Sequence, residues 1–140
     1  HNPRFHGKAT RMLLTALVCA GIASLIHVMI FALESLLWTT PRGRSVFGTS
    51  AEEAAATREL AFNQGFYNLF LAVITVVGVV LLALGSIAAG AALVFAGAGS
   101  MLLAGLVLLI TSPGKARPAL IQLVPPLLAV GALLAALLSA

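Results

Sequence analysis

The chain has 140 residues, of which 61% are hydrophobic and only 9% are charged. Soluble domains carry about 25% charged residues, so this composition excludes an ordinary water-soluble fold and predicts an integral membrane protein. The formal net charge is +4. However, the basic residues are scattered over short segments beside apolar stretches, where they orient a protein in the lipid bilayer, and no nucleic-acid partner is expected. The single cysteine, Cys19, excludes an intrachain disulfide, and no metal or cofactor is expected.

The N-terminal region predicts a short polar tail followed by a first membrane span. Residues 1–11 are polar, and their two histidines, His1 and His6, are interpreted as solvated side chains of a tail or a tag remnant. The apolar run from Met12 to Trp38 is too long for the hydrophobic region of a signal peptide. A spanning helix needs about 20 apolar residues, so we expect an uncleaved first span here.

A polar connection over residues 39–58 leads into the second helix. Ser50-Ala51-Glu52-Glu53 is a capping-box sequence, in which the Ser50 hydroxyl caps the Glu53 amide and the Glu53 carboxylate reaches back. The helix is expected to begin there and to cross the membrane over residues 60–84.

Two turns divide the rest of the chain into two further spans. As one helix, the apolar stretch up to residue 111 would be roughly twice as long as the hydrocarbon core is thick. We therefore predict a turn at Leu84-Gly85-Ser86 and a third span over residues 87–111. Pro113-Gly114 marks the next turn, and the fourth span covers residues 118–138, where Pro125-Pro126 should kink or locally unwind the helix. The predicted fold class is all-α, a single four-helix transmembrane bundle over residues 12–140.

The distribution of Lys and Arg favours one orientation of this bundle in the inner (plasma) membrane. With both termini outside, the cytoplasmic loops hold five basic residues and the outer segments hold three, and cytoplasmic loops are usually the richer ones. The five are Arg42, Arg44, Arg58, Lys115 and Arg117, and the three are Arg4, Lys8 and Arg11.

Small residues recur every four positions along the third span. They are Ala88, Ala92, Ala96, Ser100 and Ala104, with Gly90, Gly97, Gly99 and Gly105 nearby. Such a stripe lets helix backbones approach closely in lipid. It is interpreted as intramolecular packing, with a face for a homo-oligomer as the alternative.

The first span carries two ionisable residues, His27 and Glu34, in an otherwise apolar stretch. A charge near the bilayer centre costs roughly 2.5–3.5 kcal/mol on insertion scales, so these residues stand out. Seven residues at about 100° each place Glu34 within about 20° of His27 on the helix, and Phe31 and Trp38 share that stripe. The alternatives are a structural hydrogen bond for His27, an interfacial position for Trp38, and an ion pair between Glu34 and a nearby arginine: Arg42, Arg44 or Arg58.

The start of the second span is rich in amide and phenol groups, which both donate and accept hydrogen bonds. Asn63, Gln64, Tyr67 and Asn68 cover one broad face, which Thr75 extends, and Gly65 leaves room for a neighbouring backbone or a ligand. If the first two helices are antiparallel, this face meets Glu34 and Trp38 at one depth, with Gln122 of the fourth span able to join them. We therefore predict a polar pocket between the first two helices.

The motifs in this half of the chain resemble a known family. His27-x6-Glu34-x3-Trp38 is followed by Thr40-Pro41-Arg42-Gly43-Arg44-x2-Phe47-Gly48, and then by Asn63-Gln64-Gly65-x-Tyr67-Asn68-x2-Leu71-Ala72. This run resembles the DUF1304 family of small bacterial membrane proteins over about the first half of the chain. The resemblance implies four transmembrane helices and supplies no biochemical activity.

Three functions fit these residues. In the first, the pocket binds a small amphipathic or cationic ligand or relays protons. Glu34 is then the counter-charge or proton acceptor and His27 its relay, and the ligand-binding residues are Trp38, Asn63, Gln64, Tyr67 and Asn68. In the second, His27 and Glu34 are the catalytic groups of an isomerase-like intramembrane enzyme that acts on a lipophilic substrate. In the third, the polar cluster only locks the helices of a structural or assembly protein.

Overall fold

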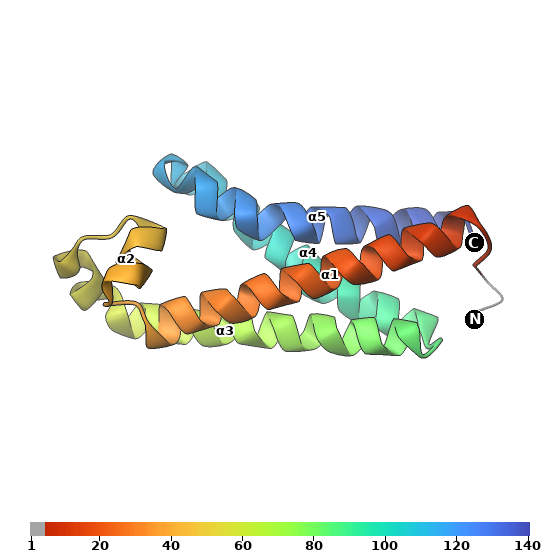
Figure 1. The fold of residues 1–140 in the computed structure, drawn as a ribbon, viewed down its shortest axis with the longest axis horizontal. Coiled ribbons are helices and arrows are strands. Elements are labelled where there is room, and N and C mark those ends of the chain that lie inside the picture. The colour runs from red at the N-terminus through yellow and green to blue at the C-terminus, as the bar shows by residue number, and fades with distance from the viewer. Residues whose placement is uncertain (1–4) are drawn as a thin grey trace.

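The computed structural model describes residues 5–140 and is a bundle of four long helices (Figure 1). They are α1 (Lys8–Phe31), continued by the π-helical turn η1 (Ala32–Leu36), α3 (Ala51–Ala83), α4 (Ile87–Thr111) and α5 (Ala116–Leu138). The short helix α2 (Pro41–Phe47) precedes α3, and the 3-10 turn η2 (Pro113–Lys115) joins α4 to α5. Within this range four helical stretches are long and apolar enough to cross a membrane. The prediction of an all-α bundle with four transmembrane helices is confirmed.

The ends of the helices differ in part from the predicted spans. Helix α1 begins at Lys8, inside the segment expected to be a tail. Residues 1–4 of the predicted tail, which include His1, lie outside the described range. The predicted capping box is present, because the Ser50 hydroxyl accepts from the Glu53 amide at 3.1 Å and the Glu53 carboxylate accepts from the Ser50 amide at 3.4 Å. The box therefore starts α3 in the polar connection, well before its apolar part.

The connections in the second half follow the predicted turns. Gly85 takes a φ of 90°, a left-handed conformation that glycine adopts without steric cost, and it reverses the chain between α3 and α4. Helix α5 continues without interruption through Pro125 and Pro126, so the local unwinding expected there does not occur. Prolines are tolerated inside transmembrane helices when neighbouring helices support the backbone, and Pro126 is fully buried in the bundle.

The four long helices form a ring in which α1 and α4 each pack against both α3 and α5. Figure 1 shows that α1 and α4 run diagonally between the other two. At the end that holds the termini, α1 lies beside α5 and α4 beside α3. At the opposite end, which carries α2, the pairs are α1 with α3 and α4 with α5. We call these the terminal end and the α2 end.

The terminal half of the bundle has a tightly packed apolar core. Small side chains of α1 and α5, such as Ala16, Ala20 and Ala136, are almost completely buried and belong to the same apolar cluster as Leu133, which has no exposed surface. Small residues let transmembrane helices approach closely and gain dispersion contacts. This half is therefore held together by close backbone packing.

Helices α3 and α4 cross at glycines. A Cβ added to Gly78 would lie 2.8 Å from the Val94 amide nitrogen and 2.9 Å from the Gly90 carbonyl oxygen. At the next contact toward the α2 end, a Cβ on Gly97 would overlap the Thr75 hydroxyl. These contacts join α3 to α4 over the half of the two helices that lies next to their connecting turn.

The small-residue stripe on α4 lies on the outside of the bundle. All five of its residues are exposed, namely Ala88, Ala92, Ala96, Ser100 and Ala104. The intramolecular contacts come from the neighbouring face, which includes Gly90, Val94, Gly97 and Met101. The expectation that the stripe itself packs inside the molecule is therefore wrong, because α4 carries small residues on both faces. The alternative, a homo-oligomer face, stays a prediction.

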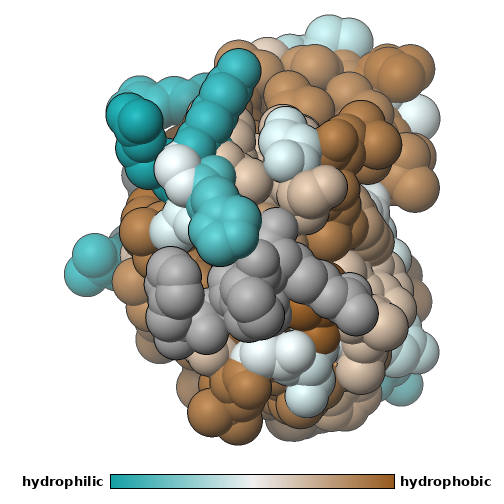
Figure 2. All heavy atoms as spheres, turned by 90° about the vertical axis from the view of Figure 1, so that its right-hand side faces the viewer, coloured by the Kyte–Doolittle hydropathy of each residue, from teal (hydrophilic) through white to brown (hydrophobic). Residues whose placement is uncertain are grey.

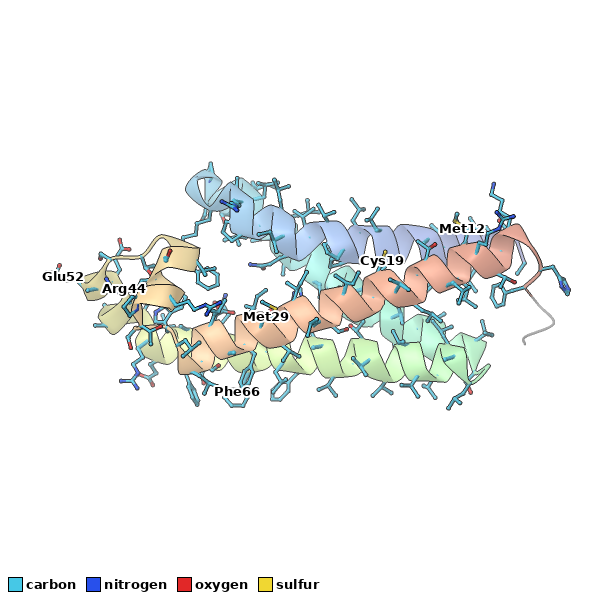
Figure 3. The ribbon with its side chains drawn as sticks, in the orientation of Figure 1. Met12, Cys19, Met29, Arg44, Glu52 and Phe66 are labelled. Carbon is cyan, nitrogen blue, oxygen red and sulfur yellow. The ribbon has the colours of Figure 1, made fainter. Side chains whose placement is uncertain are left out.

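Charged residues separate strongly between the two ends. Figure 2 views the terminal end, where the surface is mostly hydrophobic and hydrophilic side chains gather at one edge. Figure 3 shows Arg44 and Glu52 at the α2 end and Phe66 pointing away from the bundle. Since α2, the start of α3 and the α4–α5 turn all lie at the α2 end, most of the charged residues are there. The orientation with both termini outside stays a prediction.

Candidate functional site

A π-helical turn at the end of α1 directs Glu34 into the protein. The Leu37 amide donates to the carbonyl of Ala32, five residues earlier, at 3.0 Å. Such single wide turns inside helices occur frequently at functional sites. Glu34 lies in this turn and is only 4% exposed.

The π turn is tied to α3 by a close backbone approach. The Ser35 hydroxyl donates to the Phe62 carbonyl at 2.8 Å. Gly65 makes this approach possible, because a Cβ there would overlap the Ser35 hydroxyl and lie 3.1 Å from the Phe31 carbonyl. The predicted role of Gly65, room for a neighbouring backbone, is confirmed.

Within residues 5–140 the Glu34 carboxylate has one polar contact, with α3. The Asn68 amide donates to Glu34 Oε1 at 2.6 Å and also lies 3.2 Å from the Gln64 carbonyl. No ion pair to Glu34 occurs among residues 5–140. The ion pair considered as an alternative, with one of the three nearby arginines, is therefore not formed in this part of the chain. A buried carboxylate held by a single amide retains capacity for further donors.

Trp38 closes the end of α1 against the start of α3. Its indole Nε1 donates to the Thr57 hydroxyl at 3.0 Å, and its ring lies 5.3 Å from the Phe47 ring. Phe47 is held in place by α2, whose first turn is capped by the Thr40 hydroxyl at 3.3 Å from the Gly43 amide. The α2 segment therefore positions two aromatic rings at the polar end of the bundle.

These elements surround a pocket of about 770 Å³ at the α2 end. Pockets of roughly 300–1,000 Å³ are typical of small-molecule sites. One wall comes from η1, the α2 region and α3, and the other from the ends of α4 and α5. The lining residues are Glu34, Trp38, Phe47, Thr49, Glu53, Thr57, Leu60, Ala61, Gln64, Tyr67, Asn68, Leu71, Ala104, Leu108, Lys115 and Gln122.

The depth of the pocket follows from the length of α3. At 1.5 Å per residue, Leu71 lies about 18 Å along the axis from the end of α3 at Ala83, and Glu53 lies about 45 Å from it. The hydrocarbon core is about 30 Å thick. With the α3–α4 turn at the far membrane surface, the pocket begins inside the hydrocarbon and ends beyond it.

The structure brings most of the predicted site residues together. Glu34, Trp38, Gln64, Tyr67, Asn68 and Gln122 all line the pocket. Asn63 is exposed and His27 is 1% exposed, and neither lines it. The His27 Nδ1–H group donates to the Ala23 carbonyl of its own helix at 2.9 Å. The structure therefore separates the two ionisable residues that the helical stripe had grouped.

Sequence reasoning missed four polar lining residues: Thr49, Glu53, Thr57 and Lys115. Glu53 was assigned only to the capping box, and Lys115 only to a loop. One signal was available, because Glu53, Thr57, Gln64, Asn68 and Leu71 follow the spacing of one helix face. No comparable pattern points to Lys115, whose position depends on the packing of η2.

These features define a multi-pass helical membrane protein with a pocket at the α2 end of its bundle. A family profile described as a protein of unknown function, DUF1304, matches residues 21–134, and the chain belongs to this family. The match extends past the motifs of the first half and covers part or all of each of the four spans. No curated protein and no solved structure matches the chain.

Proposed function

We propose that this protein binds a small amphipathic or cationic ligand in the pocket at the α2 end, with Glu34 as the counter-charge or proton acceptor. The observation that carries the proposal is the buried Glu34 carboxylate, which lines the pocket and, among the described residues, has the Asn68 amide as its only polar contact. A charge at such a depth is costly unless a partner compensates it. A bound cation or a proton supplies that compensation.

The rest of the lining suits a ligand with both polar and apolar parts. Gln64 and Gln122 offer amides, Thr49 has a buried hydroxyl without a hydrogen-bond partner in the described chain, and Leu71 and Leu108 are apolar. Trp38 also lines the pocket, and an aromatic face attracts cations. Asn63, first expected to bind the ligand, is left out of this proposal because it does not line the pocket.

Two other functions compete with this one. An acid/base enzyme would need His27 and Glu34 to reach one substrate, and nothing in the pocket lining favours that arrangement. A purely structural role is favoured by the contacts of Glu34, Ser35 and Trp38 with α3, which hold the two helices together. The experiment must therefore separate binding from stability.

The test is to purify the protein from its membrane, extract it with organic solvent and identify bound molecules by mass spectrometry. Glu34→Gln keeps an oxygen that accepts from Asn68 but removes the negative charge. We expect the wild type to retain a ligand, and this variant to lose at least nine-tenths of it while its unfolding free energy changes by less than about 1 kcal/mol. Glu59→Gln, an exposed position outside the pocket, is the matched control.

The structural role predicts a different result. In that case the extracts of wild type and Glu34→Gln are the same, and only the stability of the bundle changes. Equal extracts would contradict the proposed function.

A further inference from the structure

The pocket has walls of opposite charge. Glu34 and Glu53 lie on the wall formed by η1 and α3, and Lys115 lies on the wall formed by η2. At the α2 end these walls belong to separate helix pairs, α1 with α3 and α4 with α5 (Figure 1). No ion pair joins Lys115 to either carboxylate within the described chain. Both signs of charge therefore remain available to one ligand.

Some of the residues that line the pocket, on α3 and α4, are exposed. Tyr67 and Leu60 line it and are 67% and 70% exposed. Ala104 of α4 is also an exposed lining residue. Along their helices, Tyr67 lies about 24 Å from Ala83 and Ala104 about 26 Å from Ile87, both within the roughly 30 Å of the hydrocarbon core. A molecule can therefore enter from within the bilayer.

From this geometry we infer that the ligand is a zwitterionic amphiphile, such as an aminophospholipid or its single-chain form, that enters between α3 and α4. The inference rests on the proposed function and narrows its ligand class. The ammonium group of the ligand binds at Glu34, and its anionic group binds at Lys115. The chain leaves the pocket past Tyr67 and Ala104 into the bilayer.

A purely cationic or anionic ligand fits the walls less well. A cation satisfies Glu34 but leaves the ammonium of the half-buried Lys115 unpaired, and an anion leaves the Glu34 carboxylate without a counter-charge. Ions removed from water without a partner cost free energy. A headgroup that carries both signs satisfies both walls at once.

Trp38 makes this testable, because it is the only tryptophan of the chain and lines the pocket. The protein in alkyl maltoside micelles is titrated with single-chain amphiphiles of equal chain length that carry bromine on the carbons next to the headgroup, and bromine quenching of Trp38 is recorded. The four headgroups are phosphoethanolamine, primary ammonium, phosphate and maltoside, the last giving the background from mixing in the micelle. We expect saturable quenching by the phosphoethanolamine probe at a concentration at least tenfold lower than for the phosphate probe and several-fold lower than for the ammonium probe.

Variants at Lys115 test whether this residue binds the anionic group of the ligand. Lys115→Gln should remove the advantage of the phosphoethanolamine probe over the ammonium probe, and Lys115→Arg should restore it. Arg117→Gln removes an exposed charge two residues away that does not line the pocket, and it should leave the advantage unchanged. Tryptophan emission of each variant without probe verifies that the fold is retained.

The outcomes separate the inference from the proposed function. If the ammonium probe binds as tightly as the phosphoethanolamine probe, or if Lys115→Gln has no effect, the zwitterion inference fails while a cationic ligand remains supported. If water-soluble phosphoethanolamine without a chain displaces the probe, entry from the bilayer is wrong. If no probe quenches Trp38 beyond the maltoside background, the inference and the proposed function both fail.

Discussion

The two halves of the bundle are stabilised in different ways. In the terminal half, alanines and glycines bring the helices into close contact around Leu133 and Val94, with almost no exposed surface inside. In the α2 half, side-chain hydrogen bonds from Glu34, Ser35 and Trp38 join α1 to α3 around a hollow. The terminal half therefore stabilises the fold, and the α2 half leaves space for a ligand.

The largest effect is expected in the packed half. Leu133→Ala removes a completely buried side chain, and cavities of this kind cost about 2–5 kcal/mol of unfolding free energy. Unfolding in mixed micelles of increasing denaturing detergent measures this loss. Leu134→Ala, one residue on and 49% exposed toward lipid, is the matched control and should change little. Equal losses at both positions would contradict the packed core.

The glycine crossing should be the next most sensitive feature. Gly78→Ala places a Cβ 2.8 Å from the Val94 amide nitrogen, and overpacking of this kind costs about 1–3 kcal/mol. The same unfolding assay measures it. Gly99→Ala is the control, because a Cβ there meets nothing within 4 Å. Alanine favours the helix over glycine by about 1 kcal/mol, so that control should be neutral or stabilised.

A smaller effect on stability is expected in the polar half. Asn68→Ala removes the one amide that donates to Glu34, and an unpaired buried acceptor costs about 1–3 kcal/mol, with the lower end expected beside a hollow that admits water. Asn63→Ala is the matched control, since Asn63 is exposed and outside the pocket. Unfolding free energies of both variants are compared with the wild type. If Asn63→Ala is as costly as Asn68→Ala, the polar contact at Glu34 is not the stabilising one.

The smallest effect concerns Trp38. Trp38→Phe retains an aromatic ring beside Phe47 but loses the indole donor to the Thr57 hydroxyl. Hydrogen bonds between transmembrane helices contribute about 0.6 kcal/mol on average. A double-mutant cycle with Thr57→Val should show a coupling of this size. Fully additive losses would mean that the hydrogen bond contributes nothing.

The sequence predicted the local features of the fold well. The four spans, the capping box at Ser50 and the turn at Gly85 depend on neighbouring residues in the chain, so their patterns are readable directly. The burial of Glu34 could also be predicted, because a carboxylate exposed to the hydrocarbon core costs free energy. These features need no knowledge of how the helices cross.

Features that depend on helix crossing could not be predicted. His27 and Glu34 share a stripe of the first helix, yet they are about 10 Å apart along its axis. Only Glu34 lines the pocket. Lys115 lines the pocket because α4 diverges from α3 beyond Gly97, which is a property of the assembled bundle. The outward face of α4 carries as many small residues as its packed face, so composition alone does not distinguish them.

The length of α3 has a consequence for the membrane around the protein. Helix α3 has 33 residues and α4 has 25, so from their shared turn α3 reaches about 12 Å further toward the α2 side. With the α3–α4 turn at one membrane surface, the first turns of α3, which carry Glu53 and Thr57, extend beyond the roughly 30 Å of the hydrocarbon core. Bilayers differ in thickness by a few Å, and mismatch costs fractions of a kcal/mol per Å. A thicker bilayer would bring these turns into the hydrocarbon region, and a thinner one would expose them to water. The lipid composition would therefore set how far water reaches into the pocket.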